Sequence, residues 1–175
     1  MFRAPTREEL TQLRRSFDRW GIFTFMEAQR LILNHNRLVN KKEVHVTTKA
    51  SQAILHKTLQ PYQVGLAIGE LRNKKFVPLL PGAEIIARYS VNFPYVVVND
   101  VAEGLVLYGR DILGESVVKV SNRLDQNKTL IILNKNRESI GIGRTRFSGE
   151  GLFQKGEATV YTLCDAGMYL RDQDD

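Results

Sequence analysis

Two arginines, Arg144 and Arg146, directly follow the glycine pair Gly141-Ile142-Gly143. The surrounding residues are typical of a strand, and a glycine inside a strand marks a bulge or a point where another backbone approaches closely. Guanidinium groups bind phosphates through charge-assisted hydrogen bonds. The pair is not a dinucleotide-binding motif, because Arg146 stands where that motif needs a third glycine and no helix follows. The sequence therefore predicts a glycine-interrupted strand whose arginines contact phosphates.

Aromatic side chains alternate with basic ones at three places in this half of the chain. Phe147 follows the arginine pair, Phe153 precedes Lys155 by two positions, and Tyr108 precedes Arg110 by two positions. Proteins that bind single-stranded RNA use this mixture, since rings stack on bases and cations neutralise phosphates. A place in the hydrophobic core is the alternative for Phe147 and Phe153, and the sequence leaves it open. The arginines fit a core poorly, because an unpaired buried guanidinium is very costly.

Catalytic and metal-binding chemistry finds no motif in the sequence. The three histidines, His35, His45 and His56, are ten and eleven positions apart, and the one cysteine, Cys164, cannot build a zinc cluster. Nucleophile-elbow, Walker-loop and His-Glu-x-x-His patterns are all absent. We therefore expect a protein that is not an enzyme and uses no metal or cofactor.

Apolar runs and cysteine content indicate the cellular setting. The longest apolar runs, residues 95–98 and 130–133, are far too short to cross a bilayer. Arginines interrupt the N-terminal region where a signal peptide would need an apolar stretch. A single cysteine rules out an internal disulfide and fits a reducing compartment. We expect a cytoplasmic protein, nucleolar if the organism is eukaryotic, without membrane contact.

Positive charge is concentrated in the first half of the chain. The formal net charge is +6, and residues 1–92 hold 15 Lys and Arg against 7 Asp and Glu. Residues 93–175 hold 10 against 12. A basic surface attracts polyanions such as nucleic acids, although a basic excess also serves solubility.

The first helix is predicted from Thr6 to Trp20, because Thr6 and Glu9 form a capping box and apolar residues recur at helical spacing. Gly21 is a typical helix stop. The face opposite the apolar residues carries four arginines, which form either a partner-binding surface or simply a solvated face. These are Arg7, Arg14, Arg15 and Arg19.

Short strands and helices alternate through the rest of the first half, which predicts a mixed α+β domain. Strands are expected at residues 23–25, 30–33, 44–46, 64–71 and 76–79, and helices at residues 48–57 and 81–86. A domain boundary falls near residues 92–94. Beyond it, strands are expected at residues 95–98, 115–120, 129–133, 140–147 and 158–163, with one helix at residues 101–108. Five short strands with one early helix predict a small closed or half-closed β-barrel.

Three motifs of the second half resemble those of the PUA domain, a small β pseudo-barrel. They are Leu107-Tyr108-Gly109-Arg110-Asp111, the glycine pair, and Asp165-Ala166-Gly167-Met168-Tyr169-Leu170-Arg171. In the first half, residues 63–70, Lys75-Phe76 and residues 80–84 are similar to the N-terminal domain of the Nip-seven family of ribosome-biogenesis proteins. The match covers nearly the full length in the family's order. The chain therefore resembles an archaeal-type member of that family with a C-terminal PUA domain.

The resemblance implies an N-terminal α+β domain (residues 1–92) that binds partners and a PUA domain (residues 93–175) that binds RNA. It implies a non-enzymatic role in large ribosomal subunit biogenesis, with rRNA precursors and uridine-rich single strands as ligands. The partners it implies are ribosome-assembly factors such as the Shwachman–Bodian–Diamond protein, and exosome components. The alternative is a protein–protein adaptor in ribosome assembly or RNA processing whose PUA barrel is mainly structural.

One departure from the family pattern determines the predicted RNA site. The last PUA strand, residues 158–164, contains no Lys or Arg, whereas some archaeal relatives carry basic residues there. The positive charge must therefore come from other segments. We predict RNA contacts for Tyr108, Arg110, Arg144, Arg146, Phe147, Lys155 and Arg171.

Overall fold

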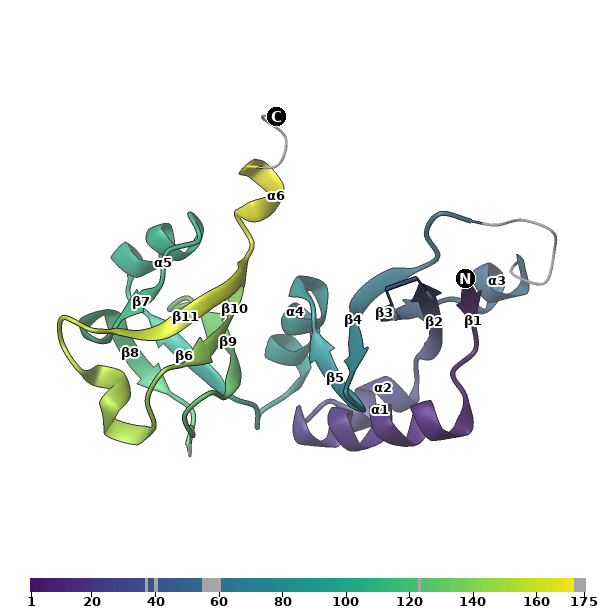
Figure 1. Ribbon diagram of the computed structural model, residues 1–175, viewed down its shortest axis with the longest axis horizontal. Coiled ribbons are helices and arrows are strands. Elements are labelled where there is room, and N and C mark those ends of the chain that lie inside the picture. The colour runs from purple at the N-terminus through teal and green to yellow at the C-terminus, as the bar shows by residue number, and fades with distance from the viewer. Residues whose placement is uncertain (37, 40, 55–60, 123, 172–175) are drawn as a thin grey trace. The chain divides into compact units, whose positions relative to one another are not determined.

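The computed structural model describes residues 1–36, 38–39, 41–54, 61–122 and 124–171. The chain divides into two compact units, Met1–Ser90 and Val91–Asp175. Each unit contains its own sheet (Figure 1). Each also has its own set of buried apolar side chains.

A five-stranded antiparallel sheet forms the N-terminal unit, in the order β1-β2-β3-β4-β5. Its strands are β1 (Phe2–Arg3), β2 (Arg30–Asn36), β3 (Lys41–Thr47), β4 (Leu66–Arg72) and β5 (Lys75–Pro78). The predicted hairpin of β4 and β5 is confirmed. Asn73 and Lys74 close it with φ values of 48° and 62°, and positive φ at both central residues is what a type I′ turn requires.

Helix α1 (Arg7–Arg19) packs on β5 and confirms the predicted capping box. The Glu9 backbone N–H donates to the Thr6 hydroxyl, and the Thr6 N–H donates to the Glu9 carboxylate. Leu13 and Phe17 are buried on the inner side of the helix, and each such side chain contributes roughly 1.5–3 kcal/mol. The hydroxyl of Ser16 accepts a hydrogen bond of 3.0 Å from the Phe76 N–H, which fixes the helix to the hairpin.

Residues 23–25, predicted as a strand, instead belong to helix α2 (Phe23–Glu27). Ile22 and Met26 are both buried, and the Met26 N–H donates to the Ile22 carbonyl at 2.9 Å. Two residues four positions apart lie on one face of a helix, so a helix can bury both of them in the core. The alternation of Phe23 and Phe25 around a threonine produced the wrong prediction.

Two further helices complete the N-terminal unit. Helix α3 (Lys49–Ile54) confirms the first part of the helix predicted at residues 48–57, of which residues 55–57 lie outside the described chain. Helix α4 (Leu80–Tyr89) confirms and extends the helix predicted at residues 81–86. A Cβ on Gly82 would lie 1.9 Å from the Ile68 carbonyl oxygen of β4, so the helix packs on the strand through a contact that only glycine allows.

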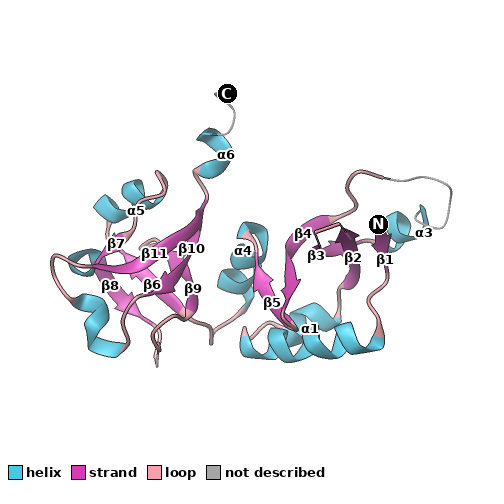
Figure 2. Ribbon diagram, viewed as in Figure 1, coloured by secondary structure: helices cyan, strands magenta, loops and turns pink. Residues whose placement is uncertain are grey.

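The C-terminal unit is a six-stranded sheet in the order β7-β11-β10-β9-β6-β8, in which only the β6–β9 pair is parallel among the described strands. The strands are β6 (Tyr95–Val98), β7 (Ile112–Leu113), β8 (Val117–Val120), β9 (Thr129–Leu133), β10 (Ser139–Thr145) and β11 (Ala158–Asp165). The sheet curls into a barrel-like form with β7 and β8 at its edges (Figure 2), which confirms the predicted half-closed barrel.

Short helices connect or follow the strands of this sheet. They are α5 (Asp100–Val106), η1 (Gly114–Ser116), η2 (Gly149–Phe153) and α6 (Met168–Arg171). The strand predicted at residues 115–120 is wrong in its first part, because residues 115 and 116 belong to η1. The core side chains are Val96, Val98, Ala102, Val106, Ile112, Val117, Leu124, Leu130, Ile132, Ile140, Leu152 and Val160.

Gly141 and Gly143 confirm the predicted close approach of another backbone. A Cβ on Gly141 would lie 2.8 Å from the Cys164 carbonyl oxygen, and one on Gly143 would lie 2.9 Å from that of Tyr161. The strand register also shifts beside each glycine. The backbone that approaches is therefore that of the neighbouring strand β11.

Candidate nucleic-acid interface

Strand β11 is the element beside which four of the predicted arginines are placed. Arg146 contacts Glu157 just before the strand, and Arg144 lies opposite Tyr161. The Arg110 carbonyl is bonded to Thr162, and Arg171 binds Asp165. At about 3.3 Å per residue, these contacts extend over about 26 Å. The strand that lacks basic residues is thus bordered by basic residues from other segments.

Arg144 and Tyr161 form the most accessible part of this arrangement. They are direct register partners on β10 and β11. The neighbouring Val160 points into the core, so Tyr161 and Arg144 lie on the outer face of the sheet. Tyr161 is 41% exposed, and Arg144 is exposed without an ion pair to any described residue. The sequence prediction did not include Tyr161, although its place next to a core valine in a strand was the signal available.

Tyr108 and Arg110 follow the end of α5 at a turn through Gly109, which has a φ of 74°. The Tyr108 side chain is 74% exposed, and Arg110 is also exposed. The Thr162 hydroxyl donates to the Arg110 carbonyl at 2.9 Å, and the Thr162 N–H donates to the Asp111 carboxylate at 2.9 Å. These bonds fix the turn against β11 and leave its side chains available to a ligand.

Arg146 and Phe147 are more strongly engaged within the protein. The Arg146 guanidinium donates to Glu157 at 3.0 Å and lies 5.2 Å from the centre of the Phe147 ring. Phe147 is only partly exposed, so part of its ring is unavailable for stacking on a base. Lys155 is exposed and forms no ion pair with the described residues. Arg144 is therefore a better phosphate ligand than Arg146.

Arg171 links the end of β11 to the segment that follows α5. Its guanidinium binds both carboxylate oxygens of buried Asp165, at 3.1 and 2.9 Å, and also donates to the Leu107 carbonyl. A Cβ on Gly167 would lie 1.9 Å from the same Leu107 carbonyl oxygen, so the two segments are in backbone contact. The motifs at residues 107–111 and 165–171 thus meet in space, with Arg171 as a connecting side chain.

The four arginines of α1 do not form one face. At 100° per residue, Arg15 and Arg19 share a stripe, and Arg7 and Arg14 share another roughly 110° away. All four are exposed and unpaired within the described part of the chain. Arg14 borders an apolar groove of about 220 Å³, whereas Arg15 and Arg19 continue the line of Glu8 and Gln12.

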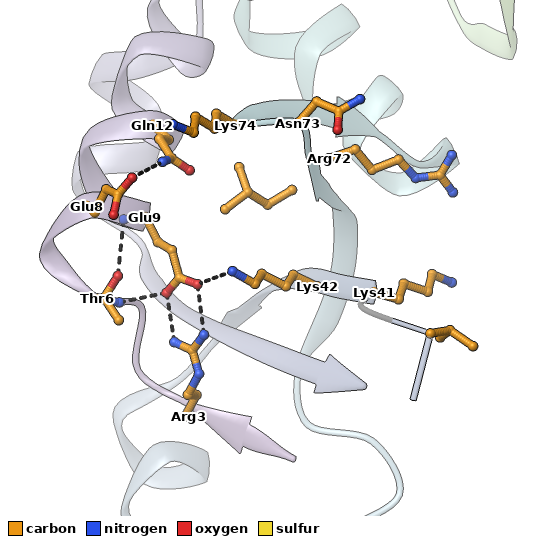
Figure 3. Close-up of a pocket in the computed structure, with 12 residues that line it drawn as sticks. Arg3, Thr6, Glu8, Glu9, Gln12, Lys41, Lys42, Arg72, Asn73 and Lys74 are labelled. Atoms are coloured by element: carbon orange, nitrogen blue, oxygen red, sulfur yellow. Dashed lines mark hydrogen bonds and ion pairs between the residues drawn. The ribbon is translucent and has the colours of Figure 1, made fainter. Parts of the chain in front are cut away.

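Glu8 and Gln12 line an open cavity of about 860 Å³ between α1, β3 and the β4–β5 hairpin (Figure 3). Its central group is Glu9, whose side chain is 7% exposed. Arg3 donates to both Glu9 carboxylate oxygens at 2.7 and 2.8 Å, and Lys42 lies 2.9 Å from one of them. These donors, Arg3 first, hold the Glu9 pKa well below its ordinary value against the opposing effect of burial.

Replacing Glu9 by glutamine tests this network, because glutamine keeps the capping box but removes the charge. The unfolded chain binds a proton at Glu9 more readily than the folded one, so the stabilisation is present at neutral pH and is lost as pH falls below about 5. We expect E9Q to be about 2 kcal/mol less stable at pH 7, with a difference that shrinks in acid. Urea unfolding followed by Trp20 fluorescence measures it, and a difference independent of pH would contradict the network.

The described residues offer little support for metal binding, for a reactive thiol or for a membrane-spanning helix. No group of three His, Cys, Asp or Glu side chains there is placed to hold a metal ion. Burial, with a smaller effect of Asp165, raises the pKa of the Cys164 thiol, which keeps it protonated at neutral pH. No helix of the described chain is both long and apolar enough to span a membrane.

Known proteins resemble this chain over almost its full length. Residues 2–80 match the family described as NIP7/UPF0113, pre-PUA domain, and residues 94–174 match the UPF0113 PUA domain. A UPF0113 protein of Archaeoglobus fulgidus is 33% identical over 174 residues, which are 98% of this chain and 95% of that one.

Two solved structures share the fold over the whole of both chains. One is a hypothetical protein of Pyrococcus horikoshii, with a TM-score of 0.69 and 10% identity. The other is a conserved PUA domain protein of Thermoplasma acidophilum, with a TM-score of 0.65 and 12% identity. At these identities the likeness is one of fold alone.

Proposed function

Since the chain belongs to the UPF0113 family, with a pre-PUA domain followed by a PUA domain, we propose that it binds single-stranded RNA through the outer face of β10 and β11. It acts as a binding protein and not as an enzyme. The observation that carries the proposal is the pair Arg144 and Tyr161, a guanidinium without an ion pair among the described residues directly opposite an exposed ring.

The chemistry of this pair fits an unstacked nucleotide. A tyrosine ring can stack on any base, and the adjacent guanidinium can bind the phosphate of the same strand. The bases of a duplex are stacked on one another and offer no free face, so a ring at the surface selects single strands. Tyr108 and Arg110 repeat the combination on the other side of β11 and extend the contact to neighbouring nucleotides.

The biological setting is proposed from the family. The NIP7/UPF0113 match over residues 2–80 supports a role in large ribosomal subunit biogenesis, with rRNA precursors as the RNA. Ribosome-assembly factors such as the Shwachman–Bodian–Diamond protein, and exosome components, are the proposed protein partners. The proposed compartment is the cytoplasm, or the nucleolus in a eukaryote.

Replacing Tyr161 by alanine is expected to weaken binding to a fluorescent oligouridine by about 5- to 150-fold, since stacking contributes about 1–3 kcal/mol per base. Replacing Arg144 by glutamine should instead reduce the slope of log affinity against log salt by about 0.7, the value for one phosphate contact on a single strand. Fluorescence anisotropy over a range of salt concentrations measures both effects.

Tyr62→Ala and Lys119→Gln are the matched controls, because both side chains are exposed and lie outside the proposed site. Equal affinities for Y161A and Y62A would overturn the site. A wild-type protein that binds no single-stranded RNA would overturn the function and favour the protein-adaptor hypothesis.

A further inference from the structure

The positive charge of this protein is concentrated in its N-terminal half, outside the PUA domain. The first 92 residues carry the excess of 15 basic over 7 acidic side chains, while the remainder is slightly acidic. Phosphate contacts dominate the affinity of proteins for nucleic acids. An RNA-binding role that rested on the C-terminal unit alone would leave this excess without a ligand.

The cavity beside α1 retains positive charge after its internal ion pairs are counted. Arg3 and Lys42 share the carboxylate of Glu9, so this cluster keeps one net positive charge, which the nearby Glu8 offsets. Lys41 and Arg72 pair with neighbouring glutamates, so the unpaired Lys74 leaves the cavity with a net positive charge. Lys42 extends into the cavity toward Glu9, and Lys74 extends from the hairpin turn toward Gln12 (Figure 3). Lys74 forms no ion pair with any described residue.

Arg15 and Arg19 continue this positive charge along α1. They follow Gln12 by three and seven positions, so they lie one and two helical turns beyond it on the same stripe. The hydrogen bond from the Phe76 N–H to Ser16 places the hairpin beside this part of the helix. We call the resulting row of Lys42, Lys74, Arg15 and Arg19 the α1 basic track.

The remaining lining indicates the class of ligand. Among the described residues that line the cavity, none is aromatic, and only Val39 and Leu71 have apolar side chains. Protein interfaces combine arginines with buried aromatic anchors in well-packed pockets, and base recognition needs stacking or base-edge contacts. A surface with exposed cations and few apolar groups fits a sugar–phosphate backbone better than either.

We propose that the α1 basic track is a second RNA contact, which binds the phosphate backbone without reading sequence. The inference rests on the proposed RNA-binding function and adds a site in the N-terminal unit. It assigns Arg15 and Arg19 to RNA, in contrast to the expectation that all four α1 arginines bind a protein partner.

The test compares two double variants that remove the same charge. R15Q/K74Q removes two positive charges from the track. The control, R14Q/K75Q, removes two positive charges at the positions next to them in the sequence. Arg14 and Lys75 are also exposed, but Lys75 does not line the cavity, and Arg14 lies about 100° around α1 from Arg15, outside the track. None of the four forms an ion pair within the described chain, so both variants should fold normally. Thermal unfolding of each protein checks this.

The ligand is a fluorescent oligouridine of roughly 20 nucleotides, longer than the roughly 4–16 nucleotides that one small domain covers. Between about 50 and 200 mM salt, R15Q/K74Q should lose about 1.4 from the slope of log affinity against log salt, which corresponds to two phosphate contacts. Its affinity at the lower salt should fall at least about 7-fold relative to wild type, because a slope difference of about 1.4 changes the affinity ratio by about 7-fold over this range of salt. The control should keep both values.

Each outcome separates this inference from the proposed function. Equal effects of the two double variants would overturn the track, because they would show a response to net charge alone. An unchanged R15Q/K74Q, in a protein where Y161A still loses affinity, would also overturn it while leaving the function intact. A wild-type protein that binds no single-stranded RNA would overturn the proposed function itself.

Discussion

Replacing Arg171 by glutamine is expected to lower the free energy of unfolding of the C-terminal unit by about 3 kcal/mol. The change removes both hydrogen bonds to Asp165, whose side chain is only 6% exposed, and the bond to the Leu107 carbonyl. A buried carboxylate that loses its cation remains without compensation, which costs about 3–5 kcal/mol. We take the lower end, because the Arg171 side chain is 39% exposed and water can replace part of the contact.

Hydrogen–deuterium exchange of the β10 and β11 amides, together with thermal unfolding, measures this effect. Arg110→Gln is the control, since Arg110 is exposed and its side chain has no ion pair within the described residues. Arg110→Gln should leave stability unchanged and weaken RNA binding. A variant R171Q that kept its stability but lost RNA affinity would show instead that Arg171 serves RNA directly.

Local sequence signals predicted the parts of the fold that depend on neighbouring residues. The strands predicted at residues 95–98 and 129–133 match β6 and β9 in both bounds, because each is a short, mostly β-branched or aliphatic run. The capping box of Thr6 and Glu9 is also confirmed. In each case the residues that determine the element lie within the element or next to it.

Contacts between distant segments account for what sequence reasoning missed. Arg171 meets a carbonyl 64 positions earlier, and Arg146 meets a carboxylate 11 positions later. No local pattern reports such partners, so both arginines were predicted as free ligands of RNA. The candidate role of Tyr161 in stacking likewise depends on the strand register that places it opposite Arg144. The types of residue at the candidate site were therefore predictable from the sequence. Which of these side chains are free to bind a ligand was not, because this depends on their partners within the fold.

The glycine pair of β10 shows how such packing constrains the site itself. Ile142 and Gly143 flank the register shift against β11, and β11 carries Tyr161. A Cβ on Gly143 would lie 2.7 Å from the Val160 side chain, 2.9 Å from the Tyr161 carbonyl oxygen and 3.2 Å from the Ile132 side chain. All three neighbours belong to the packed sheet, so relief requires movement of β10 away from β11.

Gly143→Ala is therefore expected to destabilise the C-terminal unit by about 3 kcal/mol, the upper end of the cost of overpacking, and to weaken RNA binding by separating Arg144 from Tyr161. Gly104→Ala is the control. Gly104 lies in α5 with open space around its Cα, so alanine there should stabilise the protein by about 0.5–1 kcal/mol through its higher helix propensity. Thermal unfolding and oligouridine titration of both variants measure these opposite effects. A G143A protein as stable as wild type would mean that β10 and β11 can separate at little cost, and the position of Arg144 beside Tyr161 would then not be fixed by the strand packing.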